Sequence, residues 1–335
     1  GKGLARVYKQ QLDDLRNRMG EFVNGRHHLA SKWDSIDRRH NLTFAEFRDR
    51  YSGKTPVILT DLQALIPGWD HSRIRRTCGD KNAHAAEFKD GRLEYDMAPA
   101  MTVRDFIRDY STSNSAHYSE TAERYYMFDW SVPTYCPVLL KDFVVPGYFT
   151  QDFFQGLGDS AIRWVDSWPS LFVGPKGTRS RLHVDILETH FWMMQVEGRK
   201  EWVIFHKKDR PLLYENQDSN TFAPDAFDMD VDKHSLLSLA SGWRGVLHPG
   251  EVIYIPNGVP HQVRNLDDVI ALSMNYVDAD NVDAVLEEAH RMATEQHDED
   301  AVGLYFGLRD EGFDRTMRPQ PAHTPWRAFK RGHWG

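Results

Sequence analysis

Three residues of this chain could hold a metal ion together. His183 and Asp185 are separated by one residue, and His261 follows much later in the sequence. Residues i and i+2 of a strand point to the same side, so both side chains of this His-x-Asp can reach one ion. Two imidazoles and one carboxylate leave the opposite face of the metal open, as in non-haem Fe(II) oxygenases. The pattern differs from a structural zinc site, which needs four protein ligands.

The segments around these residues have the pattern of β-strands. Residues 189–205 comprise an apolar strand, a turn at Glu197-Gly198 and a second apolar strand that begins at Lys200. Residues 247–276 repeat this pattern, with a turn at Pro249-Gly250 and strands before and after His261. Burying an unpaired cation inside a barrel costs free energy unless an anion pairs with it. Lys200 therefore indicates a site for an anion such as a dicarboxylate.

Taken together, these motifs resemble the JmjC-domain oxygenases, which use Fe(II), 2-oxoglutarate and O₂. More specifically, the chain resembles the small JmjC protein hydroxylases, including the lysyl hydroxylases of the phosphatidylserine-receptor type. The resemblance covers roughly residues 40–280. It is carried by Tyr126–Asp129, Val145–Thr150, Gly174–Gly177, His183 with Asp185, Gly198–Trp202, Pro249–Glu251, and His261 with Asn265–Asp267.

The resemblance implies a mainly β fold with flanking helices, namely a double-stranded β-helix (the jelly-roll barrel) with helical additions at both ends. It assigns the metal to His183, Asp185 and His261. We expect three parts: an N-terminal helical extension at 1–40, the barrel domain at 41–280, and a C-terminal helix with a basic, aromatic tail at 281–335.

The resemblance also implies a binding site for 2-oxoglutarate. The positions that match Lys200 and Tyr126 grip its distal carboxylate, and Ser180 stands where relatives place a Ser or Thr that assists. Two further positions match polar residues near the co-substrate, namely Ser273 and Asn275. Met193 stands where some relatives carry an Asn that faces the site, so the partner of the proximal carboxylate stays open.

The activity implied by the resemblance is hydroxylation of a C–H bond in a protein side chain, with lysine favoured. Demethylation of N-methyl-lysine or methyl-arginine is an alternative, but the chain shows no reader or zinc domain that would direct it to chromatin. Another jelly-roll metalloenzyme would not need Lys200. A non-catalytic JmjC scaffold is a third alternative, and the complete set of metal ligands argues against it.

Composition agrees with a soluble enzyme, and the resemblance implies that its substrate is a protein or peptide. Hydrophobic residues make up 41% of the 335 residues, and the net charge of -8 argues against general affinity for nucleic acid. No run approaches the roughly 18 apolar residues of a membrane span. Cys78 and Cys136 are too few for a disulfide framework, and whether they pair stays open. We expect a cytoplasmic or nuclear protein, or one in the endoplasmic reticulum lumen if a leader precedes Gly1.

Helices are expected on both sides of the barrel. Apolar residues recur at helical spacing in 4–22, and Thr43 to Glu46 has the pattern of a capping box before a helix at about 44–51. Further helices are expected at 100–112 and over the apolar face of 282–293, which packs on the barrel or on a second copy in a homodimer. We expect the polar stretch 215–235 to be a solvated loop. For the tail we favour packing on the domain through Trp326 and Trp334 over binding to RNA.

Overall fold

The computed structural model of the chain describes residues 33–89, 92–94, 98–115, 117–118, 124–157, 167–216, 219–310, 313, 315 and 322–330. The helix expected over 4–22 and the expected contact of Trp334 therefore lie outside the described residues. Within the described part, none of the helices is long and apolar enough to cross a membrane.

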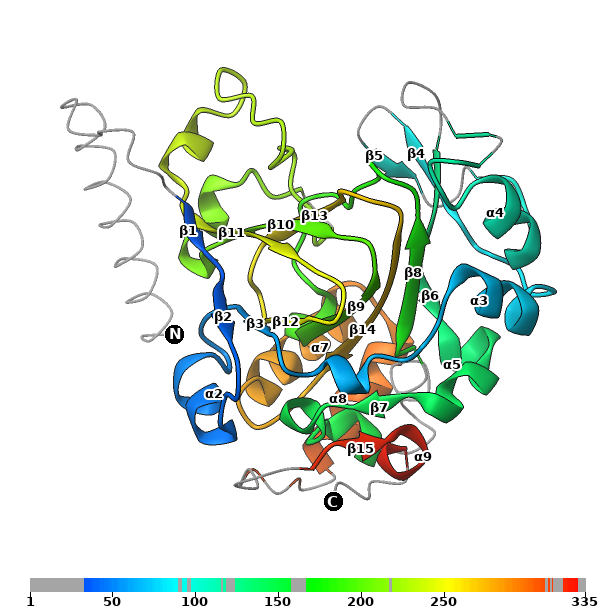
Figure 1. Ribbon diagram of the computed structural model, residues 1–335. Coiled ribbons are helices and arrows are strands. Elements are labelled where there is room, and N and C mark those ends of the chain that lie inside the picture. Colours follow the sequence, from blue (N-terminus) through cyan, green and yellow to red (C-terminus); the bar gives the residue numbers. More distant parts are fainter. Residues whose placement is uncertain are drawn as a thin grey trace, which may run out of the picture.

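Two β-sheets face each other and form the predicted jelly-roll barrel (Figure 1). The smaller sheet has the strand order β1 (Trp33–Ser35), β11 (Gly242–Leu247), β10 (Lys200–Phe205) and β13 (His261–Asn265). The larger sheet has the order β2 (Asp37–Arg39), β3 (Val57–Leu59), β12 (Val252–Ile255), β9 (His190–Glu197), β14 (Val269–Tyr276), β8 (Ser170–Gly174), β6 (Arg124–Ser131), β4 (Ala86–Lys89) and β5 (Arg92–Glu94).

Alternation along the strands divides the apolar side chains between two faces of each sheet. In β10, Trp202 and Ile204 join the core inside the barrel, whereas Val203 and Phe205 join a separate cluster on the outer face. In β9, Phe191 belongs to the inner core in the same way. Both faces of these strands are buried, which explains why they read as continuous apolar runs rather than as alternating ones.

The barrel begins earlier than expected. Residues 33–39 were assigned to the N-terminal helical extension, but they form β1 and β2. β1 pairs in parallel with β11 of the smaller sheet, and β2 pairs in parallel with β3 of the larger sheet. The short, polar sequence Trp33–Arg39 carries little strand signal of its own, so pairing with an existing sheet edge decides its conformation.

The expected capping box forms at the first described helix. At the start of α2 (Phe44–Arg50), the Thr43 hydroxyl accepts a hydrogen bond from the Glu46 backbone nitrogen. The Glu46 carboxylate in turn accepts a hydrogen bond from the Thr43 backbone nitrogen. The helix expected at 100–112 is shorter, as α4 (Val103–Asp109). The other α-helices of the described residues are α3 (His71–Cys78), α5 (Val132–Tyr135), α7 (Val282–Glu295), α8 (Glu299–Asp310) and α9 (Trp326–Phe329).

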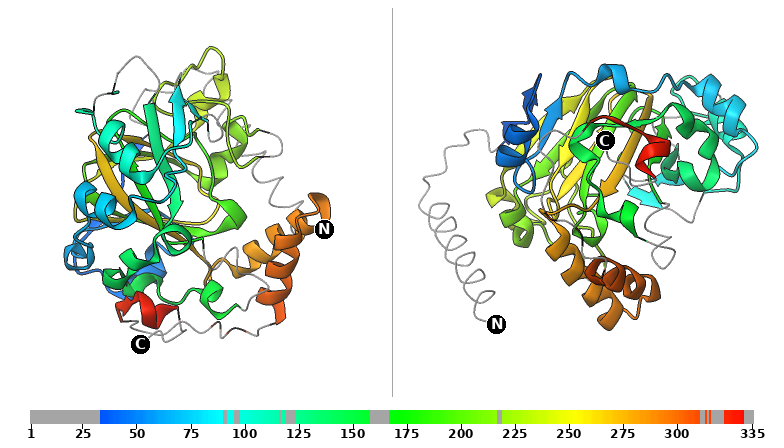
Figure 2. Two further views of the ribbon diagram at one scale, coloured as in Figure 1. Left: turned by 90° about the vertical axis from the view of Figure 1, so that its right-hand side faces the viewer. Right: turned by 90° about the horizontal axis from the view of Figure 1, so that it is seen from below.

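The C-terminal helices pack on the barrel. α7 buries Val282, Val285, Ala289 and Met292, so its apolar face is covered within the chain. α8, which the sequence did not lead us to expect, packs against α7, and Figure 2 shows the two in orange at one end of the molecule. The described part of the tail also folds back: β15 (Thr324–Pro325) pairs with β7 (Val144–Val145), and Trp326 is buried against Phe143.

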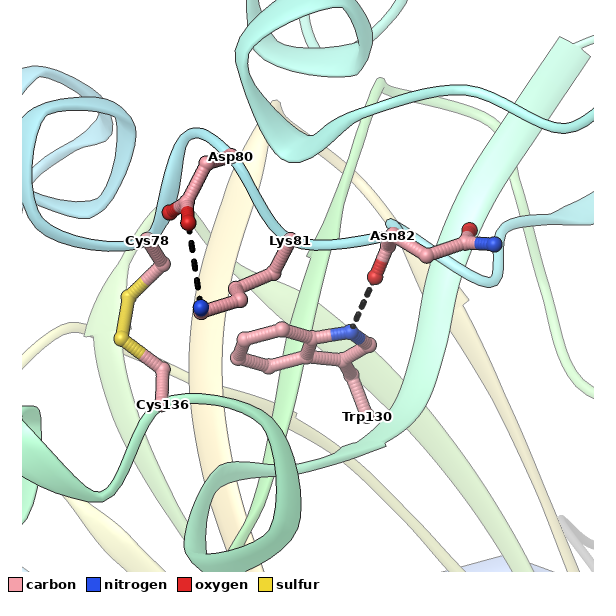
Figure 3. Close-up of a disulfide and its surroundings, with 6 residues drawn as sticks. All are labelled: Cys78, Asp80, Lys81, Asn82, Trp130 and Cys136. Atoms are coloured by element: carbon pink, nitrogen blue, oxygen red, sulfur yellow. Dashed lines mark hydrogen bonds and ion pairs between the residues drawn. A yellow bond between two sulfur atoms is a disulfide. The ribbon is translucent and has the colours of Figure 1, made fainter.

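A disulfide between Cys78 and Cys136 settles the pairing that the sequence left open (Figure 3). It joins the last residue of α3 to the residue after α5, across a sequence separation of 58. Nearby, the Trp130 indole nitrogen donates a hydrogen bond of 2.9 Å to the Asn82 carbonyl oxygen. The bridge thus fastens α3 and α5, which lie on one side of the barrel.

Candidate metal centre

A short antiparallel bridge places the two histidines side by side. The His183 backbone nitrogen donates to the His261 carbonyl at 3.0 Å, and the His261 nitrogen donates to the His183 carbonyl at 2.8 Å. His261 is the first residue of β13, but His183 lies in an isolated bridge between β8 and β9. The expectation that His183 and Asp185 share a regular strand was therefore wrong, although their extended backbone still turns both side chains to one site.

The three side chains converge on one point. One ligand atom from each of His183, Asp185 and His261 lies within 4.8 Å of the other two. The Nδ1 atom of each imidazole donates to the backbone carbonyl two residues earlier, at 2.8 Å for Arg181 and 3.0 Å for Val259. These bonds fix the tautomer and leave both Nε2 atoms as the ligand atoms.

The electrostatics of the three groups suit a cation. Burial lowers the pKa of His183 to about 4, helped by the nearby His261, and burial alone lowers the pKa of His261 to about 4. Both imidazoles are therefore neutral near pH 7, which is the form that binds metals. Burial raises the pKa of Asp185 to about 6, because a carboxylate without a bound cation is costly there. The donor set fits Fe(II).

The metal ligands open into a cavity of about 330 Å³, a usual size for a small-molecule site. Phe172, Phe191 and Trp202 form much of its apolar wall. Met193 also lines the cavity, so the residue that replaces the expected Asn does face the site. Phe191 and Met193 both belong to the inner core of the barrel as well.

Lys200 is a buried cation in the wall of the cavity. It is the first residue of β10, and its Nζ donates to the Tyr126 hydroxyl at 2.7 Å and to the Asn265 Oδ1 at 2.9 Å. Burial lowers the pKa of Lys200 to about 7. Among the described residues no carboxylate pairs with it. A buried ammonium with hydroxyl and amide partners only would be stabilised by a carboxylate, which is what a dicarboxylate co-substrate would bring.

Of the other residues predicted to contact the co-substrate, two line the cavity and one does not. Ser180 lines the cavity and accepts a bond of 3.1 Å from the Val263 nitrogen. Asn275 lines the cavity beside the candidate metal ligand Asp185, because its side chain bonds to both Asp185 and Thr189. Ser273 is buried two residues earlier on the same strand. Its hydroxyl has no partner among the described residues, and it is not part of the cavity wall.

Sequence reasoning missed several residues of this site. Asn265 was part of a motif without a role, yet it holds Lys200 and donates to Thr178 at 2.8 Å. Asn220 and Thr221 come from the stretch expected to be only a solvated loop, and both line the cavity. Asp129 also lines it, and burial raises the pKa of that carboxyl. Asn265 and Asp129 each belong to a motif that carried the resemblance, whereas Asn220 and Thr221 carried no signal in the sequence.

Comparison with known proteins agrees with the barrel fold and with the metal site described above. Residues 43–281 match the family described as cupin-like domain. The human "2-oxoglutarate and iron-dependent oxygenase JMJD4" is 31% identical over 222 residues, which cover 64% of this chain and 51% of that protein. The Arabidopsis thaliana "Lysine-specific demethylase JMJ21" is 28% identical over 257 residues, which cover 74% of this chain and 26% of that protein.

A third relative is the Caenorhabditis elegans "Bifunctional arginine demethylase and lysyl-hydroxylase psr-1", 27% identical over 268 residues, which cover 75% of this chain and 64% of that protein. The chain thus spans between 26% and 64% of the length of these three relatives. The relatives bear out the resemblance to JmjC oxygenases that the motifs indicated. Because the family match extends over most of its length, this chain belongs to the cupin-like domain family.

Proposed function

We propose that this chain is an Fe(II)- and 2-oxoglutarate-dependent oxygenase that hydroxylates a C–H bond of a protein side chain, with lysine favoured. The observation that carries the proposal is the pairing of two sites in one cavity. His183, Asp185 and His261 stand at one place, and the buried ammonium of Lys200 at another. A metal centre alone would not need Lys200, and an anion site alone would not need the three ligands.

Iron, 2-oxoglutarate and O₂ when bound supply the oxidising chemistry, in which the substrate gains one oxygen atom and 2-oxoglutarate becomes succinate and CO₂. The chain's own residues bind the co-substrate and orient the metal ligands. Lys200 and Tyr126 would bind the distal carboxylate, with Ser180 nearby. The backbone carbonyls of Arg181 and Val259 keep the imidazoles turned toward the ion. The aromatic wall excludes water, which protects the reaction from side products.

Demethylation is the second candidate. It is favoured by the names of two of the relatives, which describe demethylases. Both reactions consume 2-oxoglutarate, so succinate alone does not separate them. A substrate that gains one oxygen atom points to hydroxylation, whereas a substrate that loses a methyl group points to demethylation.

The test is a turnover screen. The purified chain would be incubated with Fe(II), ascorbate, 2-oxoglutarate and peptide pools that contain either unmodified or methylated lysine and arginine. We expect succinate to form and one pool to change in mass, and we expect His183→Ala to abolish both effects. Lys141→Ala, which removes an exposed cation outside the site, is the matched control. Absence of metal-dependent succinate from every pool would count against the oxygenase and in favour of a scaffold.

We also propose that the chain forms a homodimer through its C-terminal helices. The apolar face of α7 is used within the chain, but Val302 and Phe306 of α8 are 39% and 46% exposed. Light scattering of the wild-type chain and of a Val302→Ser, Phe306→Ser variant would measure the oligomeric state. A monomeric wild type would rule the dimer out.

A further inference from the structure

One carboxylate in the cavity has no part in the metal centre or in the Lys200 cluster. Asp129 lines the same cavity as Asp185. The other positive group in the wall, Arg181, is already paired with Glu94 at 2.7 Å. Among the described residues no cation pairs with Asp129; its hydrogen-bond partner is the uncharged Ser170. The cavity therefore offers an unneutralised carboxylate to whatever enters it.

Regular alternation along β6 would not have placed that carboxylate in the cavity. Tyr126 and Phe128 line the cavity, whereas Met127 and Trp130 belong to the core on the other side of the sheet. Successive residues of a strand point to opposite faces, so Asp129 should follow Met127 outward. Instead Phe128 and Asp129 both line the cavity, one directly after the other.

A β-bulge causes this departure. Met127–Trp130 of β6 pair with Leu171–Val173 of β8, so β6 contains one residue more than its partner over this stretch. Asp129 has a φ of 54°, in the left-handed region that few residues other than glycine, Asn and Asp adopt. Bulges beside active sites re-aim side chains. Here the residue with the left-handed backbone is the one whose carboxylate the bulge turns into the cavity, which favours a role in binding over one in packing.

We propose that Asp129 binds the positively charged head of the substrate side chain and so selects lysine or arginine; this rests on the oxygenase function proposed above. Trp168 and Ile186 are part of the same wall and offer apolar surface to an aliphatic stem. A long cationic side chain has this combination of an apolar stem and a charged head. Asp129 is close enough to Asp185 for their charges to interact, so a head group at Asp129 keeps its stem beside the metal ligands.

The test uses binding, so that it does not depend on turnover. The full chain is loaded with Co(II) and N-oxalylglycine, an unreactive analogue of 2-oxoglutarate. It is then offered two degenerate peptide pools that differ only in the central residue, lysine or norleucine. Norleucine has the same carbon stem without the amine. We expect the wild type to retain the lysine pool about ten- to a hundredfold more strongly, as for a charge-assisted hydrogen bond.

Asp129→Asn should remove this preference, because the amide keeps the shape and loses the charge. Asn tolerates the left-handed region better than most residues, so the bulge should survive. Asp49→Asn is the matched control, since Asp49 is an exposed carboxylate on α2 outside the cavity, and it should keep the preference. Retained Co(II) binding reports that the site is intact. Should Asp129→Asn not bind Co(II), Asp129→Gly, which suits a φ of 54°, takes its place.

Equal retention of both pools by the wild type would overturn the proposal, as would a lysine preference that survives the loss of the Asp129 carboxylate. Succinate formation, measured on the same preparations, separates this result from failure of the oxygenase. Turnover without a lysine preference leaves the oxygenase standing and removes the role of Asp129. A lysine preference without succinate leaves Asp129 as a binding residue and removes the oxygenase.

Discussion

The ammonium nitrogen of Lys200 lies 2.7 Å from the hydroxyl oxygen of Tyr126, although 74 residues separate the two in sequence. Lys200 comes from β10 of the smaller sheet and Tyr126 from β6 of the larger one. The contact therefore crosses the interior of the barrel. It places a cation where the protein itself provides hydroxyl and amide oxygens.

Lys200→Ala should weaken binding of 2-oxoglutarate without loss of the metal. A charge-assisted hydrogen bond in a partly desolvated site contributes about 1.5–3 kcal/mol. The apparent KM for 2-oxoglutarate should therefore rise by about ten- to a hundredfold. Lys200→Arg should also raise the apparent KM for 2-oxoglutarate, because a planar guanidinium does not fit a site shaped for an ammonium. Succinate formation against 2-oxoglutarate concentration measures the effect, and an unchanged KM in Lys200→Ala would contradict the co-substrate assignment.

Binding of 2-oxoglutarate should weaken as the pH rises above about 7. Burial lowers the pKa of Lys200 to about 7 in the site without co-substrate, so the amine is increasingly neutral above that pH. A dicarboxylate binds the charged form, so the complex must take up a proton there. Calorimetry in buffers of different ionisation enthalpy would measure this uptake. No proton uptake at pH 8 would mean that Lys200 does not meet the carboxylate.

The same pKa shift affects stability in the absence of 2-oxoglutarate. The pKa of Lys200 in the folded chain lies below its ordinary value of 10.5, so the chain loses stability as the pH falls from 10.5 toward 7. Lys200→Met should be more stable than the wild type at pH 7, and this advantage should shrink at higher pH. Thermal unfolding of both proteins over this range provides the comparison.

Asp185→Ala should reduce iron affinity and turnover together, because it removes the anionic ligand. Changes in groups that merely orient ligands cost about ten- to a hundredfold in metal affinity, so removal of a ligand should cost at least as much. Bound iron and succinate release would be measured on the same sample. Asp49→Ala is the matched control on an exposed carboxylate. Full activity in Asp185→Ala would leave Asp185 with a structural role only.

Metal affinity should fall as the pH drops below about 6. In this range the Asp185 carboxylate, whose pKa burial raises to about 6, takes up a proton that competes with the ion. The pKa of His183 and His261 is about 4, so the imidazoles remain neutral through this window. Titration with Co(II) at several pH values measures the trend. In Asp185→Asn the affinity should be lower and its dependence on pH near 6 should disappear.

Loss of the disulfide should destabilise the fold and leave the metal site intact. Closing a loop of 58 residues lowers the entropy of the unfolded chain, which corresponds to about 4 kcal/mol at 25 °C. A Cys78→Ala, Cys136→Ala variant should therefore unfold at a lower temperature and still bind Co(II). Reductant should lower the Tm of the wild type but not that of the variant. Two free thiols in the denatured, unreduced wild type would disprove the bridge.

Local signals in the sequence determined several parts of this protein. The Thr43–Glu46 capping box is made within one turn of chain, so four residues suffice to specify it. The apolar runs in β9 and β10 exceed what a half-exposed strand would carry, and both strands are buried on both faces. The metal ligands were recognisable because His183 and Asp185 lie two residues apart and His261 follows a Pro249-Gly250 turn and a strand.

Other features depend on which segments meet, and only the tertiary structure decided them. Asn265 holds Lys200 because β10 and β13 pair in a register that sets these two residues opposite each other. Asp129 faces the cavity because β6 has one residue more than β8 where they pair. Residues 33–39 become strands because two sheet edges are there to receive them. Backbone pairing between distant strands sets each of these, and its register is not encoded in any single stretch of sequence.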